Sequence, residues 1–143
     1  MADEKYDQDF FLALAVKGKD AWNEWRRDPA HKDVRVTFAG IDFSEPPRDK
    51  IDFSGFEFGN DGDFSQCKWR GGWGRAGDIL QMGNRFSSGQ AFFKGAAFGR
   101  AASFVGATFG SDANFTGTAF GDSAIFTYAL FGPGAKFDDA VFG

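Results

Sequence analysis

Phenylalanine recurs in the C-terminal part of the chain at steps of five and six residues in strict alternation, which makes the true repeat eleven residues long. The residue two places before each Phe is Ala in nine of ten cases and Thr118 in the tenth. A Gly follows every second Phe, so the consensus reads Ala-x-Phe-x-Gly-Ala-x-Phe-Gly-x-x. Ten consecutive matches indicate a repeat architecture. We predict that the recurring residues form the structural core: Phe93, Phe98, Phe104, Phe109, Phe115, Phe120, Phe126, Phe131, Phe137 and Phe142.

The spacing favours short strands over a helix. An eleven-residue period would suit a right-handed helical supercoil, but each Gly costs about 1 kcal/mol in a helix interior. On an extended backbone, Phe and the Ala two places earlier face the same side, because side chains alternate with period two. Sides of five or six residues need stacked coils, about 4.8 Å apart, to pair their backbones. The pattern therefore predicts an all-β solenoid with columns of Phe inside.

The alternation of Ala-x-Phe-x-Gly with Ala-x-Phe-Gly-x-x resembles the Phe-rich branch of the pentapeptide-repeat family. The resemblance implies a right-handed quadrilateral β-helix, with each Phe and the residue two before it inside, and a short N-terminal α-helical cap. One coil then takes 22 residues. We therefore expect Phe93, Phe115 and Phe137 to stack in one column, and Phe98, Phe120 and Phe142 in another.

The same rhythm is present, less regularly, in the first half of the chain, so that we expect the β-helix to span residues 34–143. Two loop insertions interrupt it, near 44–50, where Pro46 and Pro47 lack ladder donors, and near 70–85. After the second insertion, Leu80 and Phe86 return to the 22-residue phase with Phe58 and Phe64. The upstream repeat positions are Phe38, Phe43, Phe53, Phe58, Phe64 and Trp69.

Residues 1–33 are predicted to form the helical cap. Apolar residues at steps of three and four, from Phe11 to Trp25, are typical of one helical face. Gly18 is expected to divide the segment into two helices, with Asp20 as N-cap of the second. The sequence of residues 21–27, AWNEWRR, resembles a segment that often precedes the repeats in this family. Such a cap would cover the unpaired backbone groups of the first coil.

Composition and motifs argue against catalysis. A single Cys, Cys67, and a single His, His31, provide neither a disulfide framework nor a structural zinc site. Cys67 is interpreted as a small buried hydrophobe. Residues 72–77 match the dinucleotide-binding fingerprint, but no strand, helix or acidic residue stands where that motif requires it. We therefore predict no enzyme activity, cofactor or metal.

The N-terminus is acidic and the apolar stretch from Phe10 to Val16 is short, so we expect no signal peptide, no membrane partner and a cytoplasmic location. The last repeat, residues 138–143, carries no capping element, and terminal repeats normally need one. We therefore hypothesise a homodimer through the uncapped C-terminal coil.

Trp and Arg gather near the second insertion, and these residue types often anchor protein interfaces. The alternative is that Trp69 is the in-phase core residue and Trp73 covers the break in the array. The candidate partner-binding residues are Trp69, Arg70, Trp73, Arg75 and Arg85.

Two functions are compatible with this sequence. The first is a non-catalytic scaffold that binds a protein partner, of unknown identity, or self-associates end to end. The second follows from the resemblance, because some pentapeptide-repeat proteins imitate duplex DNA and protect topoisomerases such as gyrase. From residue 36 onward the chain has 12 Asp and Glu against 9 Lys and Arg, whereas duplex DNA as long as five coils, about 24 Å, carries about 14 charges. The scaffold is favoured, and a nucleic-acid partner is not expected.

Overall fold

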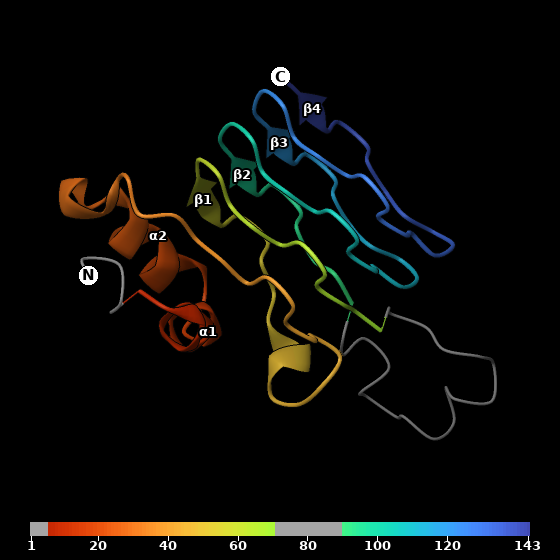
Figure 1. Cartoon of the computed structure of the whole chain (residues 1–143), viewed down its shortest axis with the longest axis horizontal. Coiled ribbons are helices and arrows are strands. Elements are labelled where there is room, and N and C mark those ends of the chain that lie inside the picture. The colour runs from red at the N-terminus through yellow and green to blue at the C-terminus, as the bar shows by residue number, and fades with distance from the viewer. Residues whose placement is uncertain (1–5, 71–89) are drawn as a thin grey trace.

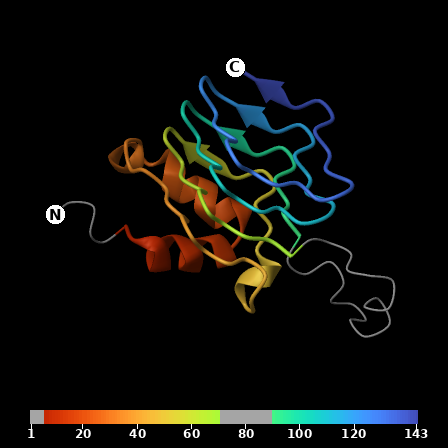
Figure 2. The same cartoon turned by 45° about the vertical axis from the view of Figure 1, so that its right-hand side comes forward.

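A computed structural model describes residues 6–70 and 90–143 of the chain. Two helices lie at one end of the molecule, and the rest of the described chain winds into a stack of short strands and turns (Figure 1). Successive coils of the stack lie side by side in both views (Figure 2). The elements are α1 (Gln8–Val16), α2 (Lys19–Arg27), the short 3-10 helices η1 (Pro29–His31) and η2 (Arg48–Lys50), and the strands β1 (Glu57–Gly59), β2 (Ala97–Phe98), β3 (Ala119–Phe120) and β4 (Val141–Phe142).

The strands β1 to β4 pair in parallel in the order of the sequence. Ala97 pairs with Ala119, which is a register of 22 residues. The same shift of 22 recurs at three further positions of the last two circuits, in the bridges Ser103 to Ile125, Thr108 to Leu130 and Asn114 to Lys136. From residue 92 onward the chain therefore returns to the same side every 22 residues, as the resemblance implies. We name the circuits coil 1 (34–59), coil 2 (60–70 and 90–99), coil 3 (100–121) and coil 4 (122–143).

The aromatic rings stack in columns inside the coils. The rings of Phe93 and Phe115 are 5.1 Å apart and inclined by 2°, and Phe137 continues the column at 5.1 Å and 3°. Rings of neighbouring columns meet edge to face, as between Phe98 and Phe104 at 74°. Offset stacks and edge contacts are the arrangements that aromatic rings prefer. The four columns are Phe38, Phe64, Phe104, Phe126; Phe43, Trp69, Phe109, Phe131; Phe53, Phe93, Phe115, Phe137; and Phe58, Phe98, Phe120, Phe142.

The prediction that Leu80 and Phe86 continue two of these columns is wrong. The ring of Phe58 stacks directly on Phe98 at 4.6 Å, and that of Phe64 on Phe104 at 5.3 Å, so both places are taken. The ladder thus passes from Trp69 to the second half of coil 2 without them, and the described residues form four coils where five were expected. Leu80, Phe86 and most of the predicted 70–85 insertion lie outside the described residues.

The Gly after every second Phe is required by the close approach of neighbouring coils. A Cβ on Gly121 would lie 2.6 Å from the carbonyl carbon of Gly99, and one on Gly132 would lie 2.7 Å from that of Gly110. Left-handed corner residues stand three places before each Phe, as at Gly95 and Gly106, and of the post-Phe glycines in coils 2 to 4 Gly110 also has a positive φ. Contact with the backbone of the coil below therefore excludes a side chain at Gly121 and Gly132.

The cap consists of two helices that meet at Gly18. Asp7 caps α1 by accepting a hydrogen bond from the backbone N–H of Phe10. Gly18, with φ at 102°, is the N-cap of α2, so the prediction of Asp20 as N-cap is wrong and Asp20 lies in the first turn. Phe11 and Trp22 are fully buried and pack against Phe38 of coil 1. The core is therefore continuous from the cap into the coils.

Candidate interaction surfaces

Side chains of the cap satisfy the backbone of coil 1. The indole Nε1 of Trp22 donates to the carbonyl oxygen of Glu57 at 2.8 Å. The side-chain amide of Asn23 makes two bonds: Nδ2 donates to the carbonyl of Gly55 at 3.0 Å, and Oδ1 accepts from the N–H of Glu57 at 2.9 Å. Asn23 thus pairs with the coil much as a neighbouring strand would. These contacts occupy the edge of the stack at this end.

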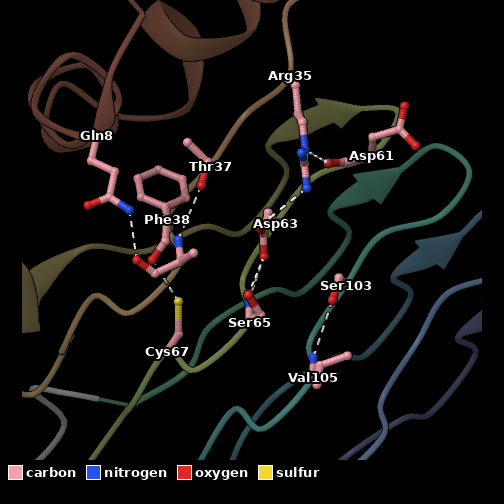
Figure 3. A network of polar contacts seen from close by, with 11 residues as sticks. Gln8, Arg35, Thr37, Phe38, Asp61, Asp63, Ser65, Cys67, Ser103 and Val105 are labelled. Atoms are coloured by element: carbon pink, nitrogen blue, oxygen red, sulfur yellow. Dashed lines mark hydrogen bonds and ion pairs between the residues drawn. The ribbon is translucent and has the colours of Figure 1, made fainter.

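A second contact of the cap is made by Gln8, whose Nε2 donates to the carbonyl oxygen of Ala39 at 2.7 Å (Figure 3). Arg26 is also buried, and its Nη1 and Nη2 donate to the carbonyl oxygens of His31 and Val34 at 3.0 and 2.9 Å. Burial lowers the pKa of the Arg26 guanidinium, although Glu57 opposes the effect. Arg26 therefore ties α2 to the segment that leads into coil 1.

The opposite end of the stack is open. Strand β4 is the edge strand of the sheet, and its carbonyl groups meet no further coil among the described residues. The ring of Phe131 is 37% exposed and that of Phe142 57%. Of the ten predicted core phenylalanines, the six in coils 2 and 3 are buried, whereas Phe126 and Phe137 are half-buried and Phe131 and Phe142 are exposed.

The exposed phenylalanines depart from the predicted core because coil 4 has no described coil above it. Exposed apolar side chains gather in the same coil: Ile125, Tyr128, Leu130 and Val141 are 42%, 84%, 65% and 61% exposed. Exposed apolar side chains gathered in one coil of a repeat protein are typical of an interaction site. The structure thus has a closed end at the cap and an open, apolar end at coil 4.

The candidate partner-binding cluster of the sequence is not brought together in the described residues. Trp69 is only 2% exposed, and its indole lies between the rings of Phe43 and Phe109 at 4.9 and 5.1 Å. A partner cannot reach it, so Trp69 is the in-phase core residue of the alternative interpretation. Arg70 is exposed at the edge of the described segment. Trp73, Arg75 and Arg85, and the fingerprint at 72–77, lie outside the described residues.

Sequence reasoning found the Phe columns but missed the outward aliphatic residues of coil 4, because single Ile or Leu residues between Phe positions look ordinary in one repeat. Comparison of equivalent positions in successive 22-residue circuits could have found them. The polar contacts of Figure 3 show what usually occupies these positions. Asp63 and Ser103 accept hydrogen bonds from the backbone N–H groups of Ser65 and Val105 at 2.9 and 3.4 Å.

The single Cys and the single His both make structural hydrogen bonds. Cys67 is buried, and its Sγ donates to the carbonyl oxygen of Phe38 at 3.0 Å (Figure 3). Burial raises the pKa of this thiol well above its usual range, so Cys67 does not supply a thiolate nucleophile. His31 shares a hydrogen bond of 2.7 Å with the carbonyl oxygen of Trp25 through Nδ1. Within residues 6–70 and 90–143, no three His, Cys, Asp or Glu side chains are grouped as metal ligands.

The stacked parallel coils and their internal aromatic columns define a β-helical repeat protein. Residues 90–141 match the family model of pentapeptide repeats, in nine copies. The match shows pentapeptide repeats over these residues and supports the resemblance, and proteins with such repeats are generally non-catalytic structural modules. No curated protein and no solved structure matches the chain. None of the helices among the described residues is long and apolar enough to cross a membrane.

Proposed function

We propose that the chain is a non-catalytic scaffold, a right-handed quadrilateral β-helix that self-associates end to end through coil 4. The four bridge positions in each 22-residue circuit support a four-sided coil. Parallel strands joined by crossovers are right-handed in nearly all proteins, which supports the hand. A rigid stack of this kind offers flat sides and an end surface to a protein partner.

The observation that carries the proposal is the difference between the two ends. At the cap, Trp22 and Asn23 occupy the backbone groups of coil 1, so that this edge cannot accept another strand. At coil 4, exposed rings such as Phe142 lie beside the edge strand β4. An unpaired apolar strand edge is a template for association with another chain.

The closed cap also supports one symmetry of the proposed assembly over another. Head-to-tail association would need coil 4 of one copy to stack on coil 1 of the next, and the helices occupy that place. Only a tail-to-tail contact, in which both copies use coil 4, leaves the caps in position. A contact of the same surface with itself closes at two copies, so the expected assembly is a two-fold dimer and not a filament.

Sedimentation equilibrium of the chain over a wide concentration range tests this proposal. We expect a reversible equilibrium between monomer and dimer, without larger species. A monomer at every concentration, or a series of growing oligomers, would contradict it.

The charge of the described coils does not favour the alternative of DNA mimicry. Residues 36–70 and 90–143 carry 11 Asp and Glu against 7 Lys and Arg, a net charge of −4. Four coils extend over about 19 Å at the strand spacing, and duplex DNA of that length has about 11 negative charges. We therefore expect the protein to leave gyrase supercoiling of a relaxed plasmid unchanged, and inhibition or protection of gyrase would restore this alternative.

A further inference from the structure

We infer that a second copy of this chain recognises the outer rim of coil 4, which consists of Ile125, Tyr128, Leu130 and Val141. The inference rests on the proposed self-association through coil 4 and specifies the side chains that make it. These four residues point away from the axis of the stack, unlike the core rings that the open end presents. They are the exposed large apolar side chains that the structure describes beyond the cap, apart from the core rings of coil 4.

The residue immediately before each core ring points outward, and its chemistry changes along the stack. On one side the paired positions are Thr37, Asp63, Ser103 and Ile125, from coil 1 to coil 4. On three of the four sides a polar or charged residue of coil 1 gives way to an aliphatic residue in coil 4. The other two such ladders are Lys68, Thr108, Leu130 and Glu57, Ala97, Ala119, Val141.

The change from polar to aliphatic residues removes a hydrogen bond that stabilises the turn. In coils 2 and 3 the oxygen atoms of Asp63 and Ser103 accept the turn N–H groups of Ser65 and Val105 (Figure 3). Ile125 stands at the equivalent position of coil 4 and has no acceptor to offer. A residue that gives up a local hydrogen bond and exposes an aliphatic side chain is typical of a binding surface.

Tyr128 is a bulky residue at a left-handed corner of coil 4. Its φ is 61°, and the equivalent corners are occupied by Gln66 in coil 2 and Gly106 in coil 3. An L-residue in this conformation costs roughly 1–2 kcal/mol, and the side chain of Tyr128 is 84% exposed, so packing within the chain does not compensate. Tyr is enriched in protein interfaces because one ring offers both apolar area and a hydroxyl.

The size of the end face argues that a second copy needs the rim. A side of five or six residues measures at most about 20 Å at about 3.3 Å per residue, so the projected end face is on the order of 400 Å². Stable interfaces bury about 800 Å² on each partner. Stacking of the flat ends alone would bury less area than a stable interface needs. The rim side chains border the end face and would add to the buried area.

A tail-to-tail contact also places the rims at the correct distance from each other. If the two coils pair as neighbouring strands do, their outward residues lie about 4.8 Å apart and contact one another as cross-strand pairs. The aliphatic residues Ile125, Leu130 and Val141 of one copy then meet residues of the partner's coil 4 in place of water. A polar residue at these positions would be desolvated on association without a fixed partner.

The test exchanges the rim for the residues that the same chain carries one coil below. The variant combines Ile125→Ser, Tyr128→Gly, Leu130→Thr and Val141→Ala, which are compatible with this backbone because they already occupy coil 3. A matched control is Val105→Ser, an outward position of coil 3 away from the contact, where coil 2 has a serine. The coil 3 equivalents are Ser103, Gly106, Thr108 and Ala119.

Sedimentation equilibrium of the three proteins gives the dissociation constant of the dimer. We expect the rim variant to weaken the dimer about 100-fold or more, and Val105→Ser to leave it unchanged. Circular dichroism and thermal unfolding establish that each variant is folded, and the single change Leu130→Thr, with a weakening of about 10-fold expected, serves if the combined variant is not. A rim variant that dimerises as tightly as the parent overturns the inference but not the proposed function. A parent that remains monomeric overturns both.

Discussion

The hydroxyl of Thr118 donates a hydrogen bond of 2.6 Å to the carbonyl oxygen of Phe93 in the coil below, and Thr118 is fully buried. Cys67 makes the corresponding contact to Phe38. Both residues stand two places before a core aromatic, where the regular repeat has Ala. A polar side chain is tolerated at this buried position because it can donate a hydrogen bond to the backbone carbonyl oxygen of a core Phe in the coil below.

Thr118→Val tests this relationship. Val has the same shape but no hydroxyl, so the carbonyl of Phe93 keeps only its backbone bond from Ala96. We expect a loss of about 0.5–1.5 kcal/mol in the free energy of unfolding, measured by urea denaturation. Thr118→Ser retains the hydroxyl and serves as the control. Equal losses in the two variants would show that packing, and not the hydrogen bond, holds Thr118 in place.

The sequence predicted the columns because their cause is local and periodic. A period-two pattern within each side and a 22-residue circuit determine which rings face inward, and the stacking of Phe93 on Phe115 follows from these alone. The cap helices were predicted for the same reason, since apolar residues recur at helical spacing from Phe11, which lies in α1, to Trp22 and Trp25, which lie in α2. The columns and the cap helices could therefore be predicted from the periodic spacing of apolar residues.

Contacts between distant residues could not be predicted in this way. The direct stacking of Phe58 on Phe98 depends on how the chain crosses a stretch without repeats, and Leu80 and Phe86 matched the spacing by chance. The pairing of Asn23 with Gly55 and Glu57 depends on how α2 lies on the coil, which no periodicity encodes. The outer rim of coil 4 could not be predicted either, because its interpretation as a contact surface depends on the exposure of its side chains in the structure.

Gly121→Ala tests the close approach of neighbouring coils. A Cβ at this position would lie 2.6 Å from the backbone of Gly99, which cannot move without disturbing the stack. We expect a loss of about 1–3 kcal/mol or a failure to fold. Gly62→Ala is the matched control, because its Cβ would meet only Phe58 and Phe98, at 3.9 and 4.0 Å. This control should be neutral or up to about 1 kcal/mol more stable, and a similar loss in both variants would contradict the interpretation.

Asn23→Ala tests the closure of the coil 1 edge. The change removes both side-chain bonds to the coil and leaves the partly buried carbonyl of Gly55 and N–H of Glu57 without the Asn23 side chain. We expect a loss of about 1–3 kcal/mol in unfolding free energy. Glu24→Ala changes the exposed neighbouring residue of α2 and should have little effect. A melting temperature of Asn23→Ala equal to that of Glu24→Ala would mean that the cap does not depend on this pairing.

The continuous stack of four coils is tested most directly by thermal unfolding after deletion of residues 72–89. The deletion joins Gly71 to Gln90 and makes the step from Trp69 to Phe93 six residues, as from Phe109 to Phe115. We predict a cooperative transition at or above the parent's temperature with an unchanged circular dichroism spectrum, whereas deletion of the 18 residues 100–117, which breaks the 22-residue register, should abolish folding. A deletion of 72–89 that unfolds the protein would contradict the four-coil arrangement.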